Sequence, residues 1–439
     1  MRFRSPHDRE IARLAVPALG TLVAEPLYVL ADTAIVGRLG TDELAGLALA
    51  STVLLSVHAL MIFLAYGTTA TVSRLIGAGE DRAAARQSVQ GLWLAALLGV
   101  VIVVLLVPLG DPLLRLLGGE GEALDQARIY LRISLAGIPF LLLTLAGAGA
   151  STGRQDTRTP LRIAVAGAIA NLVIESVLIF GLGFEIGASA LATVIAQVGT
   201  GLVFVAGIVR WGRSVGAAAR PERAAILSLL SGSWTLVLRS VALRGSFTLA
   251  AAVAARLGTV ELAAHQVAVQ IWGTLTLALD AVAIAGQALT GRWLGAGDAQ
   301  RARTAARRMI ELDIAVGAVA ALVILAVREP VAGIFSNDAA VVAAAAHALV
   351  WVALTQPLSG YVFALDGVLI GAGDLRYLAR SMLAAAVVFA GLAAVVLAAE
   401  ASLGWLWSAL VAFMVLRAVA LWWRWRGDRW VVTGVSSNP

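Results

Sequence analysis

The sequence predicts an all-α membrane protein of twelve transmembrane helices, arranged as two parallel lobes of six helices each. Hydrophobic residues make up 60% of the 439 residues, charged residues only 14%, and the mean hydropathy is +0.89. A soluble domain carries about 25% charged residues, so this composition indicates a polytopic membrane protein. Apolar runs of twenty or more residues favour helices over the alternating strands of an outer-membrane barrel. An internal repeat predicts the two lobes.

Twelve apolar segments are each long enough to cross a bilayer as a helix. Because their number is even, both termini are expected on the same side of the membrane. The segments cover approximately residues 11–37, 47–73, 88–110, 124–150, 161–183, 187–210, 234–257, 264–290, 310–328, 343–371, 378–400 and 402–423.

Two stretches of the chain repeat at one constant offset of 218 positions. Residues 38–45 (RLGTDELA) recur as 256–263 (RLGTVELA), and residues 74–80 (RLIGAGE) recur as 292–298 (RWLGAGD). Each repeat holds six predicted helices, an even number, so the two halves have the same orientation in the membrane. Parallel repeats of this kind are typical of transporters that rock one lobe against the other.

The repeat sets the predicted domain boundaries. We expect an N-terminal lobe that carries a cation site, a cytoplasmic linker, a C-terminal lobe and a cytoplasmic tail. They cover residues 1–212, 213–232, 233–426 and 427–439.

The arginines predict the orientation in the membrane. The chain has no lysine; 25 arginines, Arg74 and Arg417 included, are assigned to the termini and the loops on one side, against six on the other. By the positive-inside rule the termini are expected to be cytoplasmic. We expect the protein to lie in a bacterial plasma membrane. The first ten residues are expected to be a cytoplasmic tail and not a signal peptide. The basic clusters are interpreted as topology determinants and not as nucleic-acid sites. We expect a monomer in the lipid bilayer.

Acidic residues inside the N-terminal lobe predict a cation site. Asp32 and Glu175 lie in apolar segments with little positive charge nearby, so a bound cation or protons must compensate them. Asn171 is one turn before Glu175, and Thr193 lies at a similar depth in the outer half of the membrane. Two carboxylates, an amide oxygen and a hydroxyl suit sodium or a proton relay. The alternative is that Asp32 is a satisfied polar residue that bonds Thr33 or a neighbouring helix.

The first helix carries a second acid and two prolines. Glu25 lies seven residues before Asp32, about 10 Å along the same helix face, and is placed at the depth of His58, so a Glu25–His58 pair is one interpretation. Pro17 and Pro26 remove backbone hydrogen bonds and permit a bend. Alternatively, Glu25 is structural, because Pro26 frees a carbonyl group in a bent helix.

Charged residues in the C-terminal lobe can neutralise one another. Arg239 and Asp366 lie toward the cytoplasmic ends of their helices, and Arg244 and Asp280 lie near mid-depth. We interpret these as structural pairs or gate elements.

The sequence lacks the motifs of an enzyme. It contains no cysteine, no phosphate-binding loop, no zinc motif and no serine–histidine arrangement; residues 77–79 (GAG) form a turn after a helix. We therefore expect no enzymatic activity and no cofactor beyond a coupling ion, H⁺ or Na⁺.

Several motifs resemble the multidrug and toxic compound extrusion (MATE) family, in particular its DNA-damage-inducible protein F (DinF) branch. They are residues 29–37 (VLADTAIVG), 188–196 (ASALATVIA), 238–240 (LRS) and 365–372 (LDGVLIGA). The resemblance implies a two-lobe antiporter that expels organic compounds in exchange for protons or sodium.

The resemblance also assigns roles to residues. It implies a cation site at Asp32, Asn171, Glu175 and Thr193, with a bend of the first helix at Pro17. Glu175 stands where archaeal relatives carry aspartate. Ser359 and its neighbours are uncharged where another branch has sodium-coupling acids, so coupling is expected in the N-terminal lobe.

The leading hypothesis is a cation-coupled exporter of small amphipathic, often cationic, organic compounds. The alternative is a flippase of lipid-linked saccharides, which would need cationic side chains for pyrophosphate, and only Arg239 and Arg244 could serve. The two-lobe repeat disfavours a channel or a receptor. Protonation or cation binding at Asp32 and bending of the first helix would drive the exchange.

Overall fold

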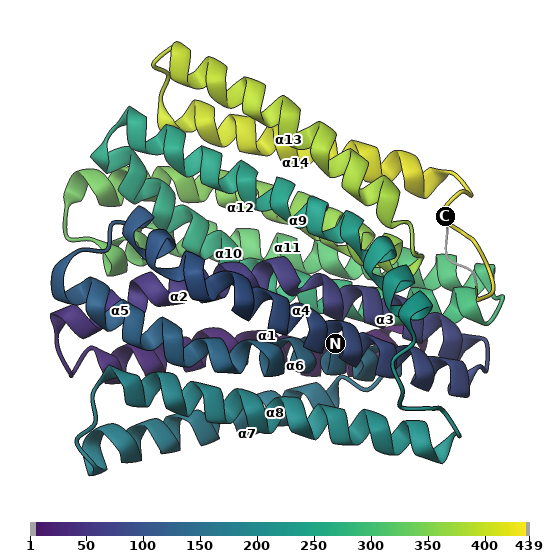
Figure 1. The fold of residues 1–439 in the computed structure, drawn as a ribbon. Helices are drawn as coiled ribbons and strands as arrows, with labels where there is room; N and C mark the ends of the chain where they lie inside the picture. The colour runs from purple at the N-terminus through teal and green to yellow at the C-terminus, as the bar shows by residue number, and fades with distance from the viewer. Residues whose placement is uncertain (1–5, 436–439) are drawn as a thin grey trace. The chain divides into compact units, whose positions relative to one another are not determined.

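The structure is a computed structural model that describes residues 6–435, and the secondary structure of this part of the chain consists of helices joined by loops (Figure 1). Each of the twelve predicted spans is present. The α-helices are α1 (Pro6–Val36), α2 (Thr41–Met61), α3 (Phe63–Gly77), α4 (Asp81–Leu116), α5 (Gly121–Ser134), α6 (Ile138–Gly153), α7 (Arg158–Ser176), α8 (Ile186–Ser214), α9 (Arg223–Leu257), α10 (Thr259–Gly295), α11 (Ala299–Phe335), α12 (Ala339–Gly371), α13 (Leu375–Ala398) and α14 (Leu403–Arg426).

Three spans contain a break in the regular α-helix. Helices α2 and α3 form one span that is interrupted at Ile62, and the 3₁₀ turn η1 (Leu135–Gly137) joins α5 to α6 just before Pro139. The π-helical segment η2 (Val177–Gly181) continues α7. Proline removes a helical hydrogen bond, which accounts for the tighter turn at Pro139.

The chain divides into two compact units. The N-terminal unit is Gly20–Ser233, and the C-terminal unit combines the segment up to Leu19 with Trp234–Pro439. In the N-terminal unit α6 packs against α3, α4 and α8, and α7 lies beside α8 (Figure 1). In the C-terminal unit α10, α11 and α12 pack tightly together, and α13 lies beside α14. Helix α1 contributes to both units.

Glycines allow the close packing in the C-terminal unit. A Cβ atom at Gly367 of α12 would lie 2.8 Å from the backbone carbon of Ala283 on α10, and one at Gly371 would lie 2.9 Å from the Cα of Gln287. Without a side chain, the two backbones can approach closely, as small residues commonly permit between transmembrane helices.

The repeat is also visible in the backbone. Gly79 and Gly297, which are 218 positions apart, both follow a helix with a positive φ, 77° and 79°. Gln155 and Gly373 form a second such pair, with φ of 62° and 75°. Equivalent turns therefore end equivalent helices in the two halves.

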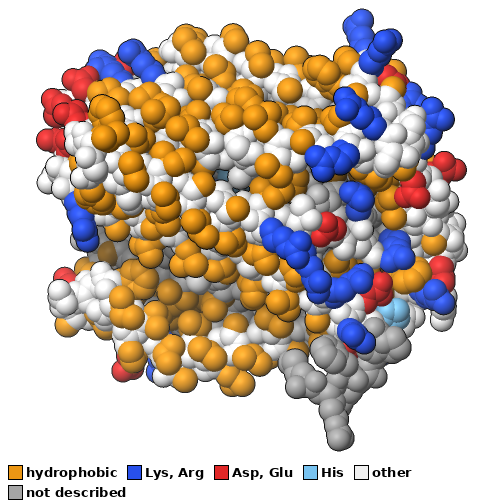
Figure 2. Space-filling view, turned by 90° about the horizontal axis from the view of Figure 1, so that it is seen from below, with side chains coloured by type: hydrophobic (Ala, Val, Ile, Leu, Met, Phe, Trp, Pro, Cys, Tyr) orange, Lys and Arg blue, Asp and Glu red, His pale blue; other side chains and the backbone are white. Residues whose placement is uncertain are grey.

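The surface has the pattern of a membrane protein. On the face in Figure 2, hydrophobic side chains cover the lengths of the helices, and most arginines gather toward one end of them. Val104, Val107, Val319 and Leu322 are exposed in the middle of α4 and α11. Such exposed aliphatic side chains are expected where lipid is the solvent.

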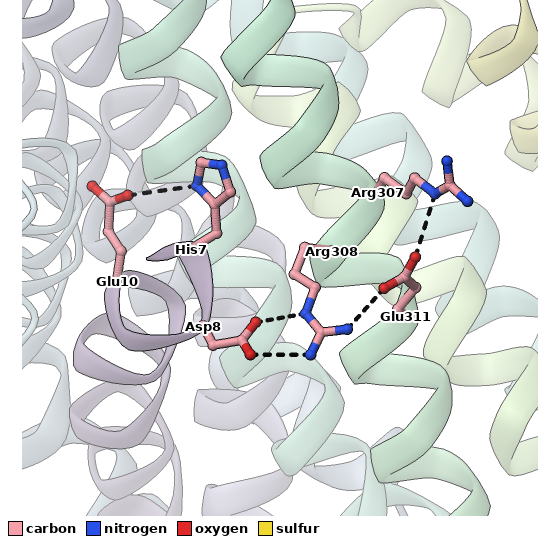
Figure 3. Close-up of polar contacts among 6 residues, drawn as sticks. All are labelled: His7, Asp8, Glu10, Arg307, Arg308 and Glu311. Atoms are coloured by element: carbon pink, nitrogen blue, oxygen red, sulfur yellow. Dashed lines mark hydrogen bonds and ion pairs between the residues drawn. The ribbon is translucent and has the colours of Figure 1, made fainter. Parts of the chain in front are cut away.

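The start of α1 is held by α11 and does not form a free tail (Figure 3). Asp8 is 5% exposed and accepts two hydrogen bonds from Arg308, at 2.5 Å from Nε and 3.0 Å from Nη2. Arg308 also donates to Glu311 at 2.8 Å. The expected tail is therefore helical from Pro6 onward, and Asp8 of this segment is buried against α11. Residues 1–5 lie outside the described part.

The segment that connects the two units is bound to α4 by hydrogen bonds and an ion pair. Gln90 donates to the carbonyl oxygen of Arg220 at 2.9 Å, and Trp93 donates to that of Ala219 at 3.0 Å. The Arg86 guanidinium forms an ion pair with Glu222, with 2.6 Å between Nε and Oε1. This hydrogen bond holds the pKa of the Glu222 carboxyl below its usual range. Polar side chains at one end of α4 thus hold the predicted linker.

Candidate functional site: a buried carboxylate cluster in the N-terminal unit

Asp32 lies on α1 and is 4% exposed. The hydroxyl of Ser189, at the start of α8, donates a hydrogen bond of 2.7 Å to Asp32 Oδ1. Ser189 is itself fully buried. A carboxylate in this environment has lost its water, and one hydroxyl replaces only a small part of that hydration.

Asn171 and Thr193 join the neighbouring helices α7 and α8. The amide nitrogen of Asn171 donates to the hydroxyl oxygen of Thr193 at 3.0 Å, and both side chains are buried. This bond orients the amide so that its oxygen is left over. The Oδ1 atom of Asn171 has no hydrogen-bond partner among residues 6–435.

Glu175 lies one turn after Asn171 and is completely buried. Its carboxylate interacts electrostatically with Asp32, but neither of its oxygens has a hydrogen-bond partner in the described chain. The π-helical segment η2 follows two residues later, and π-helical turns often occur at functional sites. The predicted site residues therefore meet at one place; they are Asp32, Asn171, Glu175 and Thr193. The acceptor oxygens of Asn171 and Glu175 have no hydrogen-bond partner there among the described residues.

Two phenols and one hydroxyl belong to this cluster and were missed by the sequence analysis. Tyr28 and Tyr130 both interact electrostatically with Asp32 and lie near Thr193. Tyr28 is four residues before Asp32 and Ser189 four residues before Thr193, so helical spacing could have identified both. Tyr130 on α5 carries no such signal.

The arrangement fits a proton or a small monovalent cation. The available groups are oxygens of carboxylates, an amide and hydroxyls, which are the ligands that hard cations prefer. A bound proton would likewise remove the repulsion between the two acids. In the described chain no three histidine, aspartate or glutamate side chains are grouped to hold a transition metal.

Glu25 and His58 form a more exposed pair. Glu25 Oε1 lies 3.0 Å from His58 Nδ1, and the Glu25 side chain is 45% exposed. The pair that the sequence analysis considered is thus present, and Glu25 also interacts electrostatically with Tyr28 of the cluster, although it is far more exposed than Asp32. Pro17 and Pro26 both lie within α1, which is helical without interruption from Pro6 to Val36.

In the C-terminal unit, Asp366 binds two arginines. Arg239 donates to it at 2.5 Å and Arg417 at 2.7 Å, and all three side chains are buried. The predicted pairing of Arg239 with Asp366 is present. The assignment of Arg417 to the cytoplasmic arginines is wrong, because its side chain is 3% exposed and lies inside α14. Arg74, 2% exposed in α3, was likewise wrongly placed in a loop.

The second expected pair of the C-terminal unit is not formed. Arg244 is exposed and makes no ion pair or hydrogen bond among residues 6–435. Asp280 instead interacts electrostatically with Asp313 of α11, a residue that the sequence analysis did not consider.

Comparisons with known proteins agree with this fold and with the repeat. The family model MatE matches the chain twice, at residues 17–177 and 236–396. The chain is 32% identical to protein DETOXIFICATION 44, chloroplastic, of Arabidopsis thaliana over 94% of its own length and 81% of that protein. It is 31% identical to DNA damage-inducible protein F of Escherichia coli K12, over 98% and 95% of the two chains.

A solved structure supports the same conclusion for the fold. An outward-facing multidrug resistance MATE family transporter of the MOP superfamily superposes with a TM-score of 0.87, at 24% identity and 96% coverage of both chains. The fold class of twelve membrane helices is thereby confirmed. The double match of the family model, together with relatives above 30% identity along nearly the whole length, shows that the chain belongs to the MATE family of membrane transporters and is not an enzyme.

Proposed function

We propose that this protein is a secondary active antiporter that exports amphipathic, often cationic, organic compounds in exchange for H⁺ or Na⁺. One observation carries the proposal: Asp32 and Glu175 are buried side by side with fewer hydrogen bonds than two carboxylates need. Such a pair is stable only with a compensating cation. The class of cargo is supported by relatives named multidrug resistance protein NorM and MdtK.

The chemistry of the site supports either coupling ion. Sodium would be held by Asp32, Glu175, the Asn171 oxygen and the Thr193 hydroxyl, while Ser189 orients Asp32. A proton would neutralise one of the two acids. In both cases the site loses its excess negative charge.

Exchange requires the two conformations to bind ion and drug with different affinity. In the outward-open state the cluster takes up the ion, α1 bends at Pro17 and Pro26, and the drug is released to the outside. In the inward-facing state the ion leaves to the cytoplasm. Because Asp32 and both prolines belong to α1, the same helix carries the charge change and the bend.

The topology that goes with this function follows the arginines. We propose cytoplasmic termini in the bacterial plasma membrane, a monomer, and two lobes at residues 1–212 and 233–426. The attachment of residues 219–222 to α4 supports a linker that keeps its place at one end of that helix.

Transport in proteoliposomes tests the proposal. Purified protein would be reconstituted into proteoliposomes, with a fluorescent organic cation placed outside or inside the vesicles. A pH gradient and a sodium gradient would then be imposed in turn. We expect one of the gradients to drive exchange, and Asp32→Asn to abolish it while the protein stays folded. The matched control is Glu25→Gln, which removes a more exposed acid of the same helix. Normal transport by Asp32→Asn would refute the proposal.

The flippase alternative is less well supported. Of the two arginines that could bind a pyrophosphate, Arg239 is engaged by Asp366.

A further inference from the structure

The C-terminal unit contains a second buried acid that the coupling site does not use. Asp313 on α11 is completely buried, and neither carboxylate oxygen has a hydrogen-bond partner in the described chain. Burying a carboxylate without partners is among the most unfavourable arrangements in a protein interior. The side chain must therefore be neutral or be compensated by a cation.

Two uncharged polar side chains lie on the facing helix at the same level. A Cβ atom at Gly360 of α12 would lie 2.6 Å from the backbone carbon of Asp313, and one at Gly317 would lie 2.7 Å from that of Gln356. Asp313 and Gly317 are thus one turn apart on the face of α11 that meets Gln356 and Gly360 on α12. Ser359 directly precedes Gly360.

The polar side chains beside Asp313 also lack hydrogen-bond partners in the described chain. Gln356 and Ser359 are completely buried, and the amide oxygen, the amide nitrogen and the hydroxyl oxygen all lack hydrogen-bond partners within residues 6–435. Together with the two oxygens of Asp313, five buried polar atoms gather where α11 and α12 touch. Native structures leave few such atoms unpaired, so a group of five calls for an explanation.

A second carboxylate, on α10, interacts electrostatically with Asp313. Asp280 is partly exposed, and its charge interacts with that of Asp313. Asp280, Asp313 and Gln356 lie 15, 14 and 15 residues from the ends of their helices at Gly295, Ala299 and Gly371. Since these three ends lie on one side of the unit, the residues share a depth of about 21–23 Å along their helices. Near the middle of these helices, the partly exposed Asp280 and the buried Asp313 thus form a pair of interacting acids.

The other charged groups on the neighbouring helices bind other partners or make no ion pair with Asp313. Arg239 and Arg417 bind Asp366, which lies ten residues beyond Gln356 on α12. Arg308 and Glu311 on α11 belong to the cluster of Figure 3. Arg244 is exposed and makes no ion pair in the described chain. Within the described part of the chain, Asp313 makes no ion pair with any of these cations.

We propose that Asp280 and Asp313 form a second proton-binding site, in which one proton neutralises Asp313 beside the uncharged polar side chains of Gln356 and Ser359. Asp280, the more exposed acid, exchanges the proton with water. Two acids close together cannot both ionise easily, and this favours one shared proton over two free carboxylates. The site is independent of the coupling proposed at Asp32.

Infrared spectroscopy of the purified full-length protein tests this site without a transport assay. The protein would carry Asp32→Asn and Glu175→Gln, so that the first cluster cannot contribute. We expect the carbonyl stretch of a protonated carboxylic acid in the pH-difference spectrum, and its loss when Asp313→Asn is added. The matched control is Glu329→Gln, an exposed acid on the same helix, which should leave the band unchanged.

Three results would overturn the proposal. They are a band that persists in Asp313→Asn, the absence of the band before that substitution, and a band that sodium removes at constant pH, because the last would identify a sodium site. If Asp313→Asn does not fold, Asp280→Asn replaces it: the proposal then requires the band to shift in frequency and in pH midpoint, and an unchanged band rejects it. Because the background lacks the first cluster, failure here leaves the proposed antiport untouched.

Discussion

Ser189 and Asp32 are 157 positions apart in the chain and are joined by a hydrogen bond of 2.7 Å between two buried side chains. The bond fixes the carboxylate of α1 to the start of α8. Since α8 also supplies Thr193, this one contact places Asp32 next to the Asn171–Thr193 pair. The position of Asp32 therefore depends on α8 as much as on α1.

This hydrogen bond predicts that substitutions of Asp32 and Ser189 have non-additive effects on ion binding. Asp32→Asn should abolish ion-driven export. Ser189→Ala should weaken it by roughly tenfold or more, because a hydrogen bond to a charged group contributes about 1.5–3 kcal/mol. In the Asp32→Asn background Ser189→Ala should have no further effect on ion binding, since its partner charge is gone. Ion binding is measured by titration of the purified protein, with Ser214→Ala, at the far end of α8, as the control. Additive losses would show that Ser189 acts elsewhere.

At Glu175, we expect removal of the carboxylate charge and displacement of the carboxylate to affect exchange differently. Glu175→Gln keeps the volume and removes the charge, so it should lower exchange by about tenfold or more. Glu175→Asp retracts the carboxylate by one methylene group and should keep exchange while changing the affinity for the ion. Proteoliposome export driven in turn by a pH and a sodium gradient separates the two. Equal losses in both variants would mean that shape, and not charge, matters at this position.

The fold and the first cluster were predictable because they depend on strong, local signals. Twenty-residue apolar runs define spans whatever their neighbours are, and a constant offset identifies the repeat. Asp32, Asn171, Glu175 and Thr193 could be grouped because few polar residues share their depth in the membrane. The hydrogen-bond pattern among them was not predictable, since it depends on side-chain directions that spacing alone leaves open.

The predictions were wrong or incomplete where the place of a charged residue depended on the exact ends of a membrane span. The ninth predicted span began at residue 310, which put Asp313 at the membrane edge, whereas α11 begins at Ala299 and carries Asp313 fourteen residues inward. Arg417 was counted as cytoplasmic because charge alone suggests a loop, yet Asp366 compensates it inside the unit. A long-range partner cannot be identified from one sequence without an alignment of relatives.

The attachment of α1 to α11 predicts a loss of stability specific to Arg308. Asp8→Asn or Arg308→Gln should lower the melting temperature by a few degrees, because each removes charged hydrogen bonds on the order of 1–3 kcal/mol. The double variant should lose little more than either single one. The adjacent Arg307, whose side chain is 80% exposed, is the control: Arg307→Gln should be neutral. Equal effects of both arginines would indicate general surface charge.

Asp366 predicts a stronger effect, because two buried guanidinium groups depend on it. Asp366→Asn leaves Arg239 and Arg417 without a carboxylate, which should destabilise the C-terminal unit by about 3–5 kcal/mol and lower the yield of monodisperse protein. Replacing all three by apolar residues (Arg239→Met, Asp366→Leu, Arg417→Met) should restore folding. Size-exclusion chromatography and thermal unfolding measure both. Failure of the triple variant to recover would assign Asp366 a role beyond charge compensation.

Glu222 predicts an acid-dependent release of the linker. Its pKa is lowered from the ordinary value of 4.5 by the hydrogen bond from Arg86. A carboxyl whose pKa is lower in the folded protein contributes stability above its unfolded pKa, and that contribution disappears as the pH falls through the folded pKa. The attachment should therefore hold at neutral pH and weaken only below about pH 4.5. Because both side chains are solvent-accessible, salt should weaken it too.

A nitroxide label next to the contact reports this release directly. The chain has no cysteine, so Ala218→Cys provides a single labelling position. Its mobility, measured by electron paramagnetic resonance, should stay low at neutral pH and rise below about pH 4.5. In Arg86→Gln the label should already be more mobile at neutral pH and respond little to acid. The hydrogen bonds of Gln90 and Trp93 to the same segment do not involve a titrating group, so they should keep the linker partly ordered in both proteins. Mobility that follows pH equally with and without Arg86 would place the titrating group outside this ion pair.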